Sequence, residues 1–351
     1  MAFSEIIGHS VGVKLISQAV GRKSLPPSLL FVGPRGVGKR LVAVALAQTL
    51  NCLSPVFIKS KKSKVGIDST VECDACGQCV ICKKISRGSH PDVMVIEPAE
   101  NGSILIDDIR KSISQTAYRP FEGKCRVVII DEADRLVLQA QNALLKTLEE
   151  PPNSSQFVLI TSRVDTLLAT VRSRCQRLNF GQLTPSQISD LLIRIHGLSE
   201  NEAWASTALA EGSIGRALLL ASGELTIVRE EAVKFLSAIA ASPNTKSCLE
   251  GSKQWLIGEG KNSGKRGSLR KELTQRLGIL LSLLRDLELV ANGGDQSSLA
   301  NVDLKKQLLP LAKTFGGNRG INGFSIITEA LHVIERNANP RIVSDWVSCR
   351  L

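Results

Sequence analysis

The sequence predicts an α/β domain with a P-loop and a parallel sheet, followed by an all-helical region. A glycine loop, Gly33–Arg40, separates a short apolar run at 29–32 from a helical pattern at 41–50, which is the strand–loop–helix context of a P-loop. Short β-branched runs then alternate with helical patterns, which is typical of a parallel sheet covered on both faces. The strand signal ends at Phe180, and helical patterns fill the remainder of the chain.

The composition of the 351-residue chain, with 43% hydrophobic residues, is sufficient for two or three domains with real cores. The chain has no 18-residue apolar run and no basic and apolar leader, so we expect a cytoplasmic protein without a membrane partner. The formal net charge of +11 indicates attraction to phosphates or acidic partners. With few aromatic residues, stacking on single-stranded bases is not the expected main mode of binding.

The elements of the α/β part are predicted in chain order. A first amphipathic helix is expected at 11–20, and the P-loop strand and helix follow it. Further strands are predicted at 92–97, 126–131, 157–161 and 176–180, and the helices between them at 106–118 and 139–148. A polar, Lys-rich and Cys-rich excursion at 52–90 interrupts this alternation.

The remaining elements are all predicted to be helices. Short ones are expected at 184–195, 200–211 and 214–222, the first with Thr184 as N-cap and Pro185 behind it. Longer ones are expected at 228–240, 270–291, 304–315 and 324–337, and the Gly/Lys-rich stretch 258–270 is expected to be a flexible loop. The predicted domains are therefore 1–180, which carries the Cys-rich insertion, then 181–225 and 226–351.

The P-loop suits a nucleotide better than it suits hydrolysis. Backbone N–H groups around Gly33, Gly36 and Gly38 can surround phosphates, and Lys39 adds a positive charge. The eighth position of the pattern G-x-x-x-x-G-K-[ST] normally holds a hydroxyl that ligates Mg²⁺, but here it is Arg40. Whether this loop still binds nucleotide is left open by the sequence.

Two further motifs are of the kind that accompanies a P-loop in nucleotide-hydrolysing proteins. The apolar run at 127–130 ends in Asp131 and Glu132, the Walker B positions that hold the Mg²⁺ shell and polarise a water. Arg174 precedes the last predicted strand, and by itself it would be read as one member of a buried ion pair. Beside the other two motifs, it is predicted to be an arginine finger that reaches a neighbour's nucleotide site.

The cysteines predict a structural metal site. Four of them, Cys73, Cys76, Cys79 and Cys82, are spaced C-x₂-C-x₂-C-x₂-C, and Cys52 lies upstream. Four thiolates suit tetrahedral Zn²⁺ and leave no open position for chemistry. An iron–sulfur cluster is the second interpretation, which the last gap of two residues disfavours. Local spacing would choose Cys73 as the fourth ligand, although ten consecutive residues bend awkwardly around one ion.

The motifs at Gly33–Arg40, Asp131–Asp134, Leu144–Pro152 and Ser173–Cys175 resemble those of the bacterial clamp-loader branch of AAA+ proteins. Within it, Leu167–Cys175 is closer to the delta prime subunits of DNA polymerase III than to the gamma and tau motor subunits. The resemblance implies an AAA+ domain, a three-helix lid at 181–225 and a helical collar at 226–351.

The resemblance also implies a role. Arg174 would act in trans on the ATP of an adjacent gamma or tau subunit, within a hetero-pentamer that includes a delta subunit and loads the sliding clamp onto primer–template DNA. The chain's own ATPase is expected to be inactive, with its binding of ATP and Mg²⁺ in question. A second interpretation is an active gamma/tau-type motor that uses Lys39, Asp131 and Glu132. A third is a stand-alone nucleic-acid-binding adaptor.

Departures from the motor pattern and the choice of metal ligands also follow from the resemblance. Gly215 stands where motors carry a sensor arginine, with Arg216 one place away, and Arg163 lies near a sensor polar position. For the metal, the family pattern aligned on His90 selects one upstream cysteine and the last three of the run. The ligands so implied are Cys52, Cys76, Cys79 and Cys82, with Cys73 as the alternate.

Overall fold

The computed structural model contains two compact units, each of which is described by itself. It describes residues 2–59, 71–99, 102–200, 203, 206–207, 210, 212–221, 224–241, 266–294, 299, 301, 304–335 and 338–351. Unit 1 comprises Met1–Ala99, Ser103–Leu198 and Ala210–Arg216, and unit 2 comprises Glu100–Gly102, Ser199–Leu209 and Ala217–Leu351. The predicted domain boundaries near residues 180 and 225 stay a prediction.

Unit 1 is built on a five-stranded parallel sheet with the order β4-β5-β6-β1-β7. The strands are β1 (Ser28–Val32), β4 (Val93–Ile96), β5 (Arg126–Ile130), β6 (Ser155–Thr161) and β7 (Gln176–Asn179). All five lie within two residues of the predicted positions. Strands β1, β5 and β6 are fully buried, whereas β4 and β7, at the two edges of the sheet, are partly exposed. The predicted P-loop fold with a parallel sheet is confirmed.

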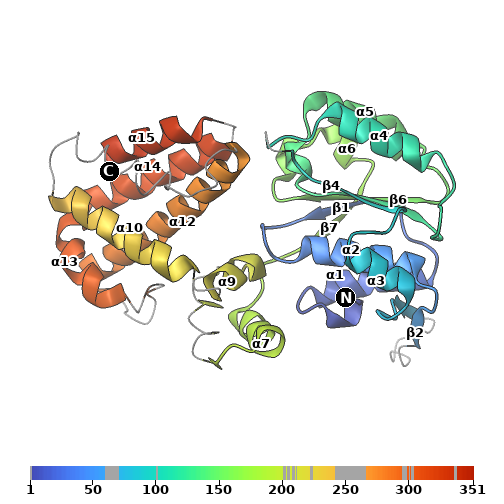
Figure 1. The fold of residues 1–351 in the computed structure, drawn as a ribbon, viewed down its shortest axis with the longest axis horizontal. Coiled ribbons are helices and arrows are strands. Elements are labelled where there is room, and N and C mark those ends of the chain that lie inside the picture. The colour runs from blue at the N-terminus through green and yellow to red at the C-terminus, as the bar shows by residue number, and fades with distance from the viewer. Residues whose placement is uncertain are drawn as a thin grey trace. The chain divides into compact units, whose positions relative to one another are not determined.

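Helices cover both faces of this sheet (Figure 1). On one face lie α1 (Ser10–Gly21), α2 (Lys39–Asn51) and α3 (Val80–Ser86), and on the other lie α4 (Ile106–Thr116), α5 (Leu138–Glu149) and α6 (Ala169–Arg172). Side chains alternate along β1, so that Leu29 and Phe31 join the first core and Leu30 and Val32 the second. Each fully buried side chain of this size contributes roughly 1.5–3 kcal/mol.

The Cys-rich insertion has more regular structure than the sequence indicates. Strand β2 (Val56–Lys59) pairs antiparallel with β3 (Val71–Asp74), and α3 follows. The sequence alone predicted no strand or helix within this insertion. Residues 60–70 lie outside the described residues, and they separate two strands that are each only four residues long. The apolar side chains of Val56, Phe57 and Ile58 are exposed.

The first helix after the sheet begins where its N-cap predicts. Helix α7 (Pro185–His196) starts at Thr184, whose Oγ1 accepts from the Gln187 N–H while the Gln187 side chain accepts from the Thr184 N–H. Helix α9 (Ile214–Ala221) matches its predicted position. The helix predicted at 200–211 lies largely outside the described residues.

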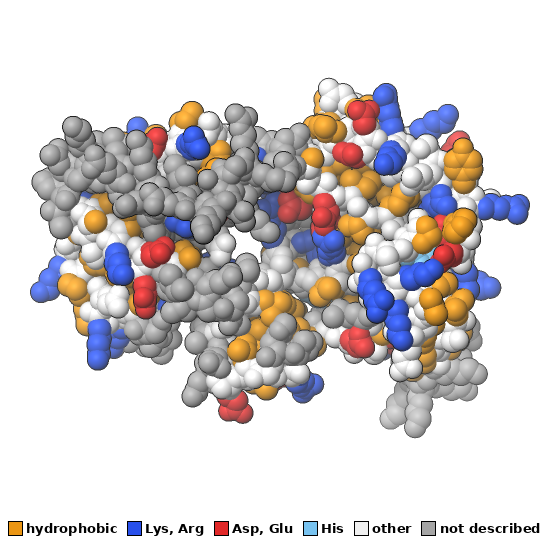
Figure 2. Space-filling model, viewed as in Figure 1, with side chains coloured by type: hydrophobic (Ala, Val, Ile, Leu, Met, Phe, Trp, Pro, Cys, Tyr) orange, Lys and Arg blue, Asp and Glu red, His pale blue; other side chains and the backbone are white. Residues whose placement is uncertain are grey.

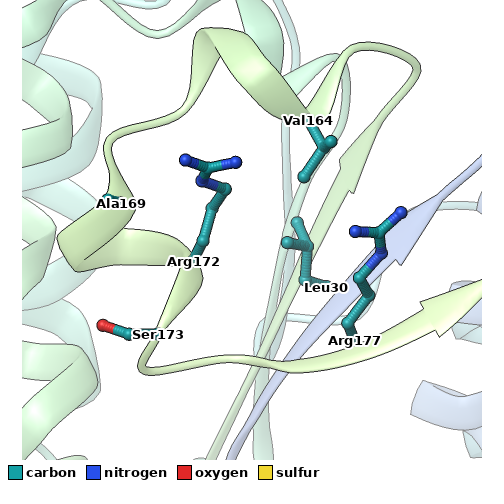
Figure 3. A pocket seen from close by; sticks show the side chains of 6 residues that line it. All are labelled: Leu30, Val164, Ala169, Arg172, Ser173 and Arg177. Carbon is teal, nitrogen blue, oxygen red and sulfur yellow. The ribbon is translucent and has the colours of Figure 1, made fainter.

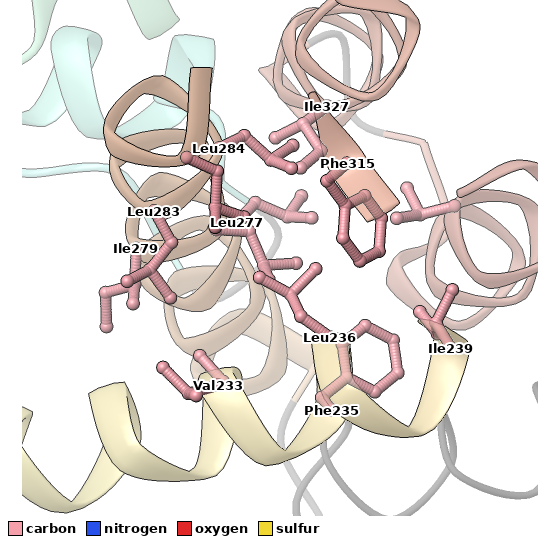
Figure 4. Packing of buried hydrophobic residues seen from close by; sticks show 14 of the residues in the cluster. Val233, Phe235, Leu236, Ile239, Leu277, Ile279, Leu283, Leu284, Phe315 and Ile327 are labelled. Carbon is pink, nitrogen blue, oxygen red and sulfur yellow. The ribbon is translucent and has the colours of Figure 1, made fainter. Parts of the chain in front are cut away.

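The described residues of unit 2 form helices that pack around an apolar core (Figure 4). The helices are α10 (Glu224–Ala241), α12 (Arg266–Ala291), α13 (Lys305–Phe315), α14 (Asn318–Glu335) and α15 (Pro340–Arg350). Leu236, Leu277, Leu284, Phe315 and Ile327 meet in this core. The prediction of a loop at 258–270 was wrong from Arg266 onward, where α12 has already begun; 258–265 lie outside the described residues.

A buried polar network links the elements of unit 2. The Asp286 carboxylate is fully buried and accepts from the backbone N–H and the side-chain amide of Asn301, at 2.7 and 2.8 Å. Asn301 Oδ1 in turn accepts from Arg229 Nε at 3.0 Å. Buried polar groups that are fully hydrogen-bonded specify one arrangement of the helices.

Among the described helices, none is both long enough and apolar enough to cross a membrane.

Candidate functional site

The P-loop, Gly33–Arg40, lies between β1 and α2, and at its start the Gly33 N–H donates to Thr161 O at 3.2 Å. Gly36 and Gly38 have φ values of +73° and +103°, a conformation that favours glycine and lets the loop curl. Among the residues that the structure describes, none accepts a hydrogen bond from the N–H groups of residues 35–39. Successive free N–H groups at a helix start form a cradle for an anion.

Lys39 is folded into this loop. Its side chain is 6% exposed, and Nζ donates to the carbonyl oxygens of Gly33 and Pro34, both at 2.6 Å. Burial lowers the pKa of Lys39 to about 8, although Asp131 and Asp134 favour its charged form. The ammonium is still mostly protonated at neutral pH, and a phosphate would supply the counter-charge that burial removes.

Arg40 contacts the carboxylates that would otherwise face Mg²⁺. Its Nη1 hydrogen-bonds Glu97 Oε1 and lies 3.5 Å from Asp131 Oδ2. Mg²⁺ in P-loop proteins is held by the Ser or Thr hydroxyl at this position and by the Walker B aspartate. The hydroxyl is missing and the aspartate is paired with a guanidinium, so the residues present do not fit Mg²⁺.

The second Walker B residue is also paired with arginine. Glu132, whose φ is +48°, accepts from Arg35 Nη2 at 3.2 Å, and Arg135 Nε lies 3.7 Å from the same carboxylate oxygen. In an ATPase this carboxylate must be free to polarise a water. Here the carboxylate is paired with two arginines instead.

Asp134 completes the pairing of acidic and basic groups. Its Oδ2 lies 3.6 Å from Arg163 Nη2 and 3.9 Å from Arg35 Nη2, and its Oδ1 accepts from Thr161 Oγ1 at 3.1 Å. In the sequence, only the position of Arg163 marked it as a candidate. Arg35, Glu97 and Asp134 also belong to the site. The parallel sheet brings these three residues together although they lie far apart in the chain.

The segment before α9 packs directly on the P-loop. Gly215 N–H donates to Gly36 O at 3.1 Å, and a Cβ on Gly36 would lie 2.1 Å from Ser213 Oγ. The residue at position 215 therefore faces the loop with its backbone and offers no cationic side chain. Arg216 is half-buried beside it.

Arg174, the predicted finger, lies at the end of α6, outside the P-loop cluster. Its Nη2 hydrogen-bonds Glu149 Oε1, at the end of α5, and its Nη1 donates to Thr170 O at 2.9 Å. The side chains of Arg174 and Glu149 are 32% and 48% exposed. Burial raises the pKa of the adjacent Cys175 thiol to about 11, so this cysteine is an inert packing residue.

A cavity of about 330 Å³ is lined in part by the two residues that precede Arg174 in the chain (Figure 3). It is lined by Leu30, Val164, Ala169, Arg172, Ser173 and Arg177. Figure 3 shows Arg172 and Arg177 on either side of an apolar floor, and Arg172 Nη1 lies 3.5 Å from Asp165 Oδ1. No P-loop residue lines this cavity, and no motif in the sequence indicated it.

The structure brings four of the five candidate metal ligands together. The Sγ atoms of Cys52, Cys76, Cys79 and Cys82 all lie within 4.8 Å of one another, and Cys73 is not in the group. The Sγ atoms of Cys52 and Cys82 are 3.8 Å apart. A tetrahedron with bonds of about 2.3 Å has ligands about 3.8 Å apart, so the group fits Zn²⁺.

Backbone donors favour thiolates in this cysteine group. The N–H groups of Cys76, Cys79 and Cys82 donate to the Sγ atoms of Cys52, Cys76 and Cys79, at 3.3–3.4 Å. Burial opposes ionisation, but N–H donors lower the pKa of Cys79 to about 6. Burial and the neighbouring thiols raise the pKa of Cys82. A bound cation would offset this crowding of negative charge.

Sequence reasoning missed a buried clamp close to the cysteines. Asp92 is fully buried and accepts from Arg126 Nη2 at 3.0 Å and from the N–H groups of residues 121–123 at 2.7–2.8 Å. Asn51 Oδ1 accepts from the next two N–H groups. The signal available in the sequence was His90-Pro91-Asp92, in which His90 Nδ1 accepts from the Asp92 N–H at 3.1 Å.

Comparison with known protein families decides the family. A family model described as DNA polymerase III, delta subunit, matches residues 8–184, half of the chain. The chain belongs to this clamp-loader family of DNA polymerase III. The matched region contains the P-loop, the Walker B strand, the cysteine group and Arg174.

The similar curated proteins are named as gamma or tau subunits. The tau subunit of Bacillus subtilis is 34% identical over 53% of this chain and 30% of its own length. The gamma subunit of Buchnera aphidicola (from Acyrthosiphon pisum) is 37% identical over 49% and 43%, and the tau subunit of Escherichia coli 33% identical over 62% and 32%. The chain thus spans about a third to under half of these relatives, and its assignment to the delta prime type becomes a proposal.

Solved structures with similarity include two from Thermotoga maritima. A gamma subunit-related protein is 22% identical, with 91% of this chain and 97% of that chain covered, at a TM-score of 0.40. A RuvB Holliday junction branch migration motor is 17% identical, with 88% of each chain covered, at a TM-score of 0.41.

Proposed function

We propose that this chain is a non-motor subunit of the clamp loader, of the delta prime type, and that it helps to load the sliding clamp onto primed DNA. The observation that carries the proposal is the contact of Arg40 with Asp131 and Glu97. Arg40 stands where a hydroxyl would ligate Mg²⁺, and its guanidinium pairs with the aspartate that would hold the ion. Arg35 and Arg135 occupy the carboxylate of Glu132, which would have to contact the attacking water in an ATPase.

The catalytic contribution that we propose is made in trans by Arg174. A guanidinium that enters a neighbour's site stabilises the charge that develops on the transferred phosphoryl group. Arg174 suits this role because it is partly exposed and is held by one half-exposed carboxylate. The adjacent gamma or tau subunit would supply the bound ATP, and its own P-loop would do the chemistry.

Single-turnover ATP hydrolysis by the isolated chain tests the non-motor assignment. We expect no Mg²⁺-dependent turnover above the uncatalysed background. The second candidate, a gamma/tau-type motor, is favoured by the names of the similar proteins and by the presence of Lys39, Asp131 and Glu132. Clear Mg²⁺-dependent turnover that Lys39→Ala abolishes would establish the motor and refute our proposal.

The third candidate, a stand-alone nucleic-acid adaptor, requires a concentrated basic surface. On the face of unit 1 in Figure 2, the Lys and Arg side chains are scattered among acidic and hydrophobic ones. Tight DNA binding by the isolated chain, with a steep dependence on salt, would support the adaptor. We instead expect co-purification with motor and delta subunits as a hetero-pentamer, through a collar at 226–351 and with a lid at 181–225.

We further propose that Cys52, Cys76, Cys79 and Cys82 hold a structural Zn²⁺. The ion would supply a tetrahedral centre joining the end of α2 to the start of α3. Elemental analysis of the purified chain should find one zinc ion per chain, and Cys82→Ser should lose it. Cys73→Ser is the matched control and should keep it. The visible absorbance of an iron–sulfur cluster, or zinc retained by Cys82→Ser and lost by Cys73→Ser, would contradict this assignment.

A further inference from the structure

We propose that the P-loop of this chain binds a nucleoside polyphosphate without a divalent metal ion, with the Arg40 guanidinium in the place of Mg²⁺. This inference goes beyond the proposed non-motor role, which needs only that the chain does not hydrolyse ATP. At the eighth P-loop position, Arg40 lacks the hydroxyl that would bind Mg²⁺ but adds a guanidinium that can itself contact phosphate.

The position of Arg40 supports the substitution. In P-loop proteins the Mg²⁺ ion bridges the first turn of the P-loop helix and the Walker B aspartate. Arg40 starts from that same first turn of α2, and its Nη1 spans to Asp131 and to Glu97 at the end of β4. The guanidinium therefore makes the bridge between helix and strand that the ion makes elsewhere.

The charge balance around the loop leaves little need for an added cation. Arg35, Lys39, Arg40, Arg135 and Arg163 face the four carboxylates of Glu97, Asp131, Glu132 and Asp134. This cluster carries a formal charge of one positive without any ion. A divalent ion would first have to displace a guanidinium from Asp131, whereas a polyphosphate finds a cationic site already assembled.

Donors for phosphate oxygens remain available. A guanidinium has five N–H donors, and only Nη1 of Arg40 contacts a described acceptor, so its Nη2 and Nε are free. The N–H groups of residues 35–39 are equally without acceptors among the described residues. Lys39 Nζ, now on Gly33 O and Pro34 O, can exchange these carbonyls for phosphate at small cost.

Isothermal titration of the full chain with ATP and with ADP, in EDTA and then in Mg²⁺, tests the inference. We expect binding in EDTA, with a Kd that Mg²⁺ does not improve by more than about twofold. Arg40→Ser restores the hydroxyl and removes the guanidinium. It should weaken binding in EDTA by roughly tenfold or more, and Mg²⁺ should then tighten it by a similar factor. Arg110→Ser, on an exposed position of α4, is the matched control and should change neither value.

Three results would overturn the inference. They are no binding of ATP or ADP in either buffer, a tenfold tightening of wild-type binding by Mg²⁺, and an unchanged affinity of Arg40→Ser in EDTA. The Arg40 side chain is half-exposed, so the variant should fold, and a thermal melt checks this. None of these results touches the finger, because the role of Arg174 is measured as ATP hydrolysis by a neighbouring subunit.

Discussion

Two arginine–carboxylate pairs of unit 1 have the same chemistry in opposite surroundings. Arg126 and Asp92 have side chains that are 11% and 0% exposed, and three backbone N–H groups also donate to Asp92. Arg174 and Glu149 are 32% and 48% exposed, and no such backbone donors hold Glu149 among the described contacts. Arg126 cannot leave Asp92 without leaving a buried, unpaired charge, whereas Arg174 can leave Glu149 at little cost because both side chains reach solvent. The difference separates an arginine that holds the fold from one that can act elsewhere.

The largest effect is expected from Arg174→Ala, measured as clamp-stimulated ATP hydrolysis in a reconstituted complex whose other motor sites are inactivated. An arginine finger is worth roughly 10³–10⁵ in kcat, and we expect a loss in that range at the adjacent site. The stability of the chain should stay within about 0.5 kcal/mol of wild type, because the pair is exposed.

The matched control for the finger is Arg177→Ala, since Arg177 is exposed nearby and its Nε donates to Asn179 Oδ1 within the same strand. Its hydrolysis rate should equal that of the wild-type complex. If Arg174→Ala also left the rate unchanged, the trans role would be refuted, and the distinction between the two pairs would have no functional meaning.

The next largest effect is expected from Asp92→Asn. The change leaves Arg126 buried with an uncharged partner and weakens the three N–H contacts that order residues 121–123. Removing one member of a buried pair costs about 3–5 kcal/mol. Urea unfolding of unit 1, followed by circular dichroism, should show a loss of this size. Asp107→Asn on α4 is exposed and should cost less than about 0.5 kcal/mol. Equal midpoints for the two variants would show that Asp92 is not a clamp.

The third effect is acid sensitivity. Burial alone would raise the pKa of Asp92, but the N–H groups of residues 121–123 and Arg126 outweigh it and lower the pKa from 3.8 to about 2. A depressed carboxyl pKa stabilises the folded state above the unfolded pKa, so this stability is lost as the pH falls from about 4 to about 2. The pKa difference corresponds to about 2 kcal/mol.

Urea midpoints measured between pH 6 and pH 2.5 check this pH dependence. The wild-type curve should fall more steeply below pH 4 than that of Asp92→Asn, which lacks the titrating group. Parallel curves would mean that other carboxylates carry the acid sensitivity of unit 1.

Sequence and structure agree where the signal is local. The sheet was predictable because its three central strands, β1, β5 and β6, are buried runs of mostly apolar residues. Arg40 stood out because one motif position demands a hydroxyl. The partners of these residues were not predictable, since Arg35 meets Glu132, and Arg126 meets Asp92, only through the strand order. Strands β2 and β3 were missed because each is four residues long and residues 60–70 separate them.

The cysteines show the same limit in another form. Spacing alone admitted Cys73, because it precedes Cys76 in an unbroken C-x₂-C repeat, whereas Cys52 lies 24 residues before Cys76. In the structure Cys73 belongs to β3, where it pairs with Phe57, and its carbonyl accepts from Ser17 Oγ at 2.9 Å. The strand therefore fixes Cys73 away from the group, while the end of α2 brings Cys52 to it.

The smallest effect is expected from Glu149→Gln, which removes the charge that holds Arg174 in its own chain. An exposed pair contributes at most about 1 kcal/mol, so stability should hardly change. Because this pair must break before the finger reaches a neighbour's phosphate, the hydrolysis rate at the adjacent site should stay equal or rise by up to about fivefold. Glu150→Gln, at the next position, is the matched control and should leave the rate unchanged. A fall to the level of Arg174→Ala would mean that Glu149 orients the finger in the assembled complex, and the exposed pair would then be as indispensable to function as the buried pair is to the fold.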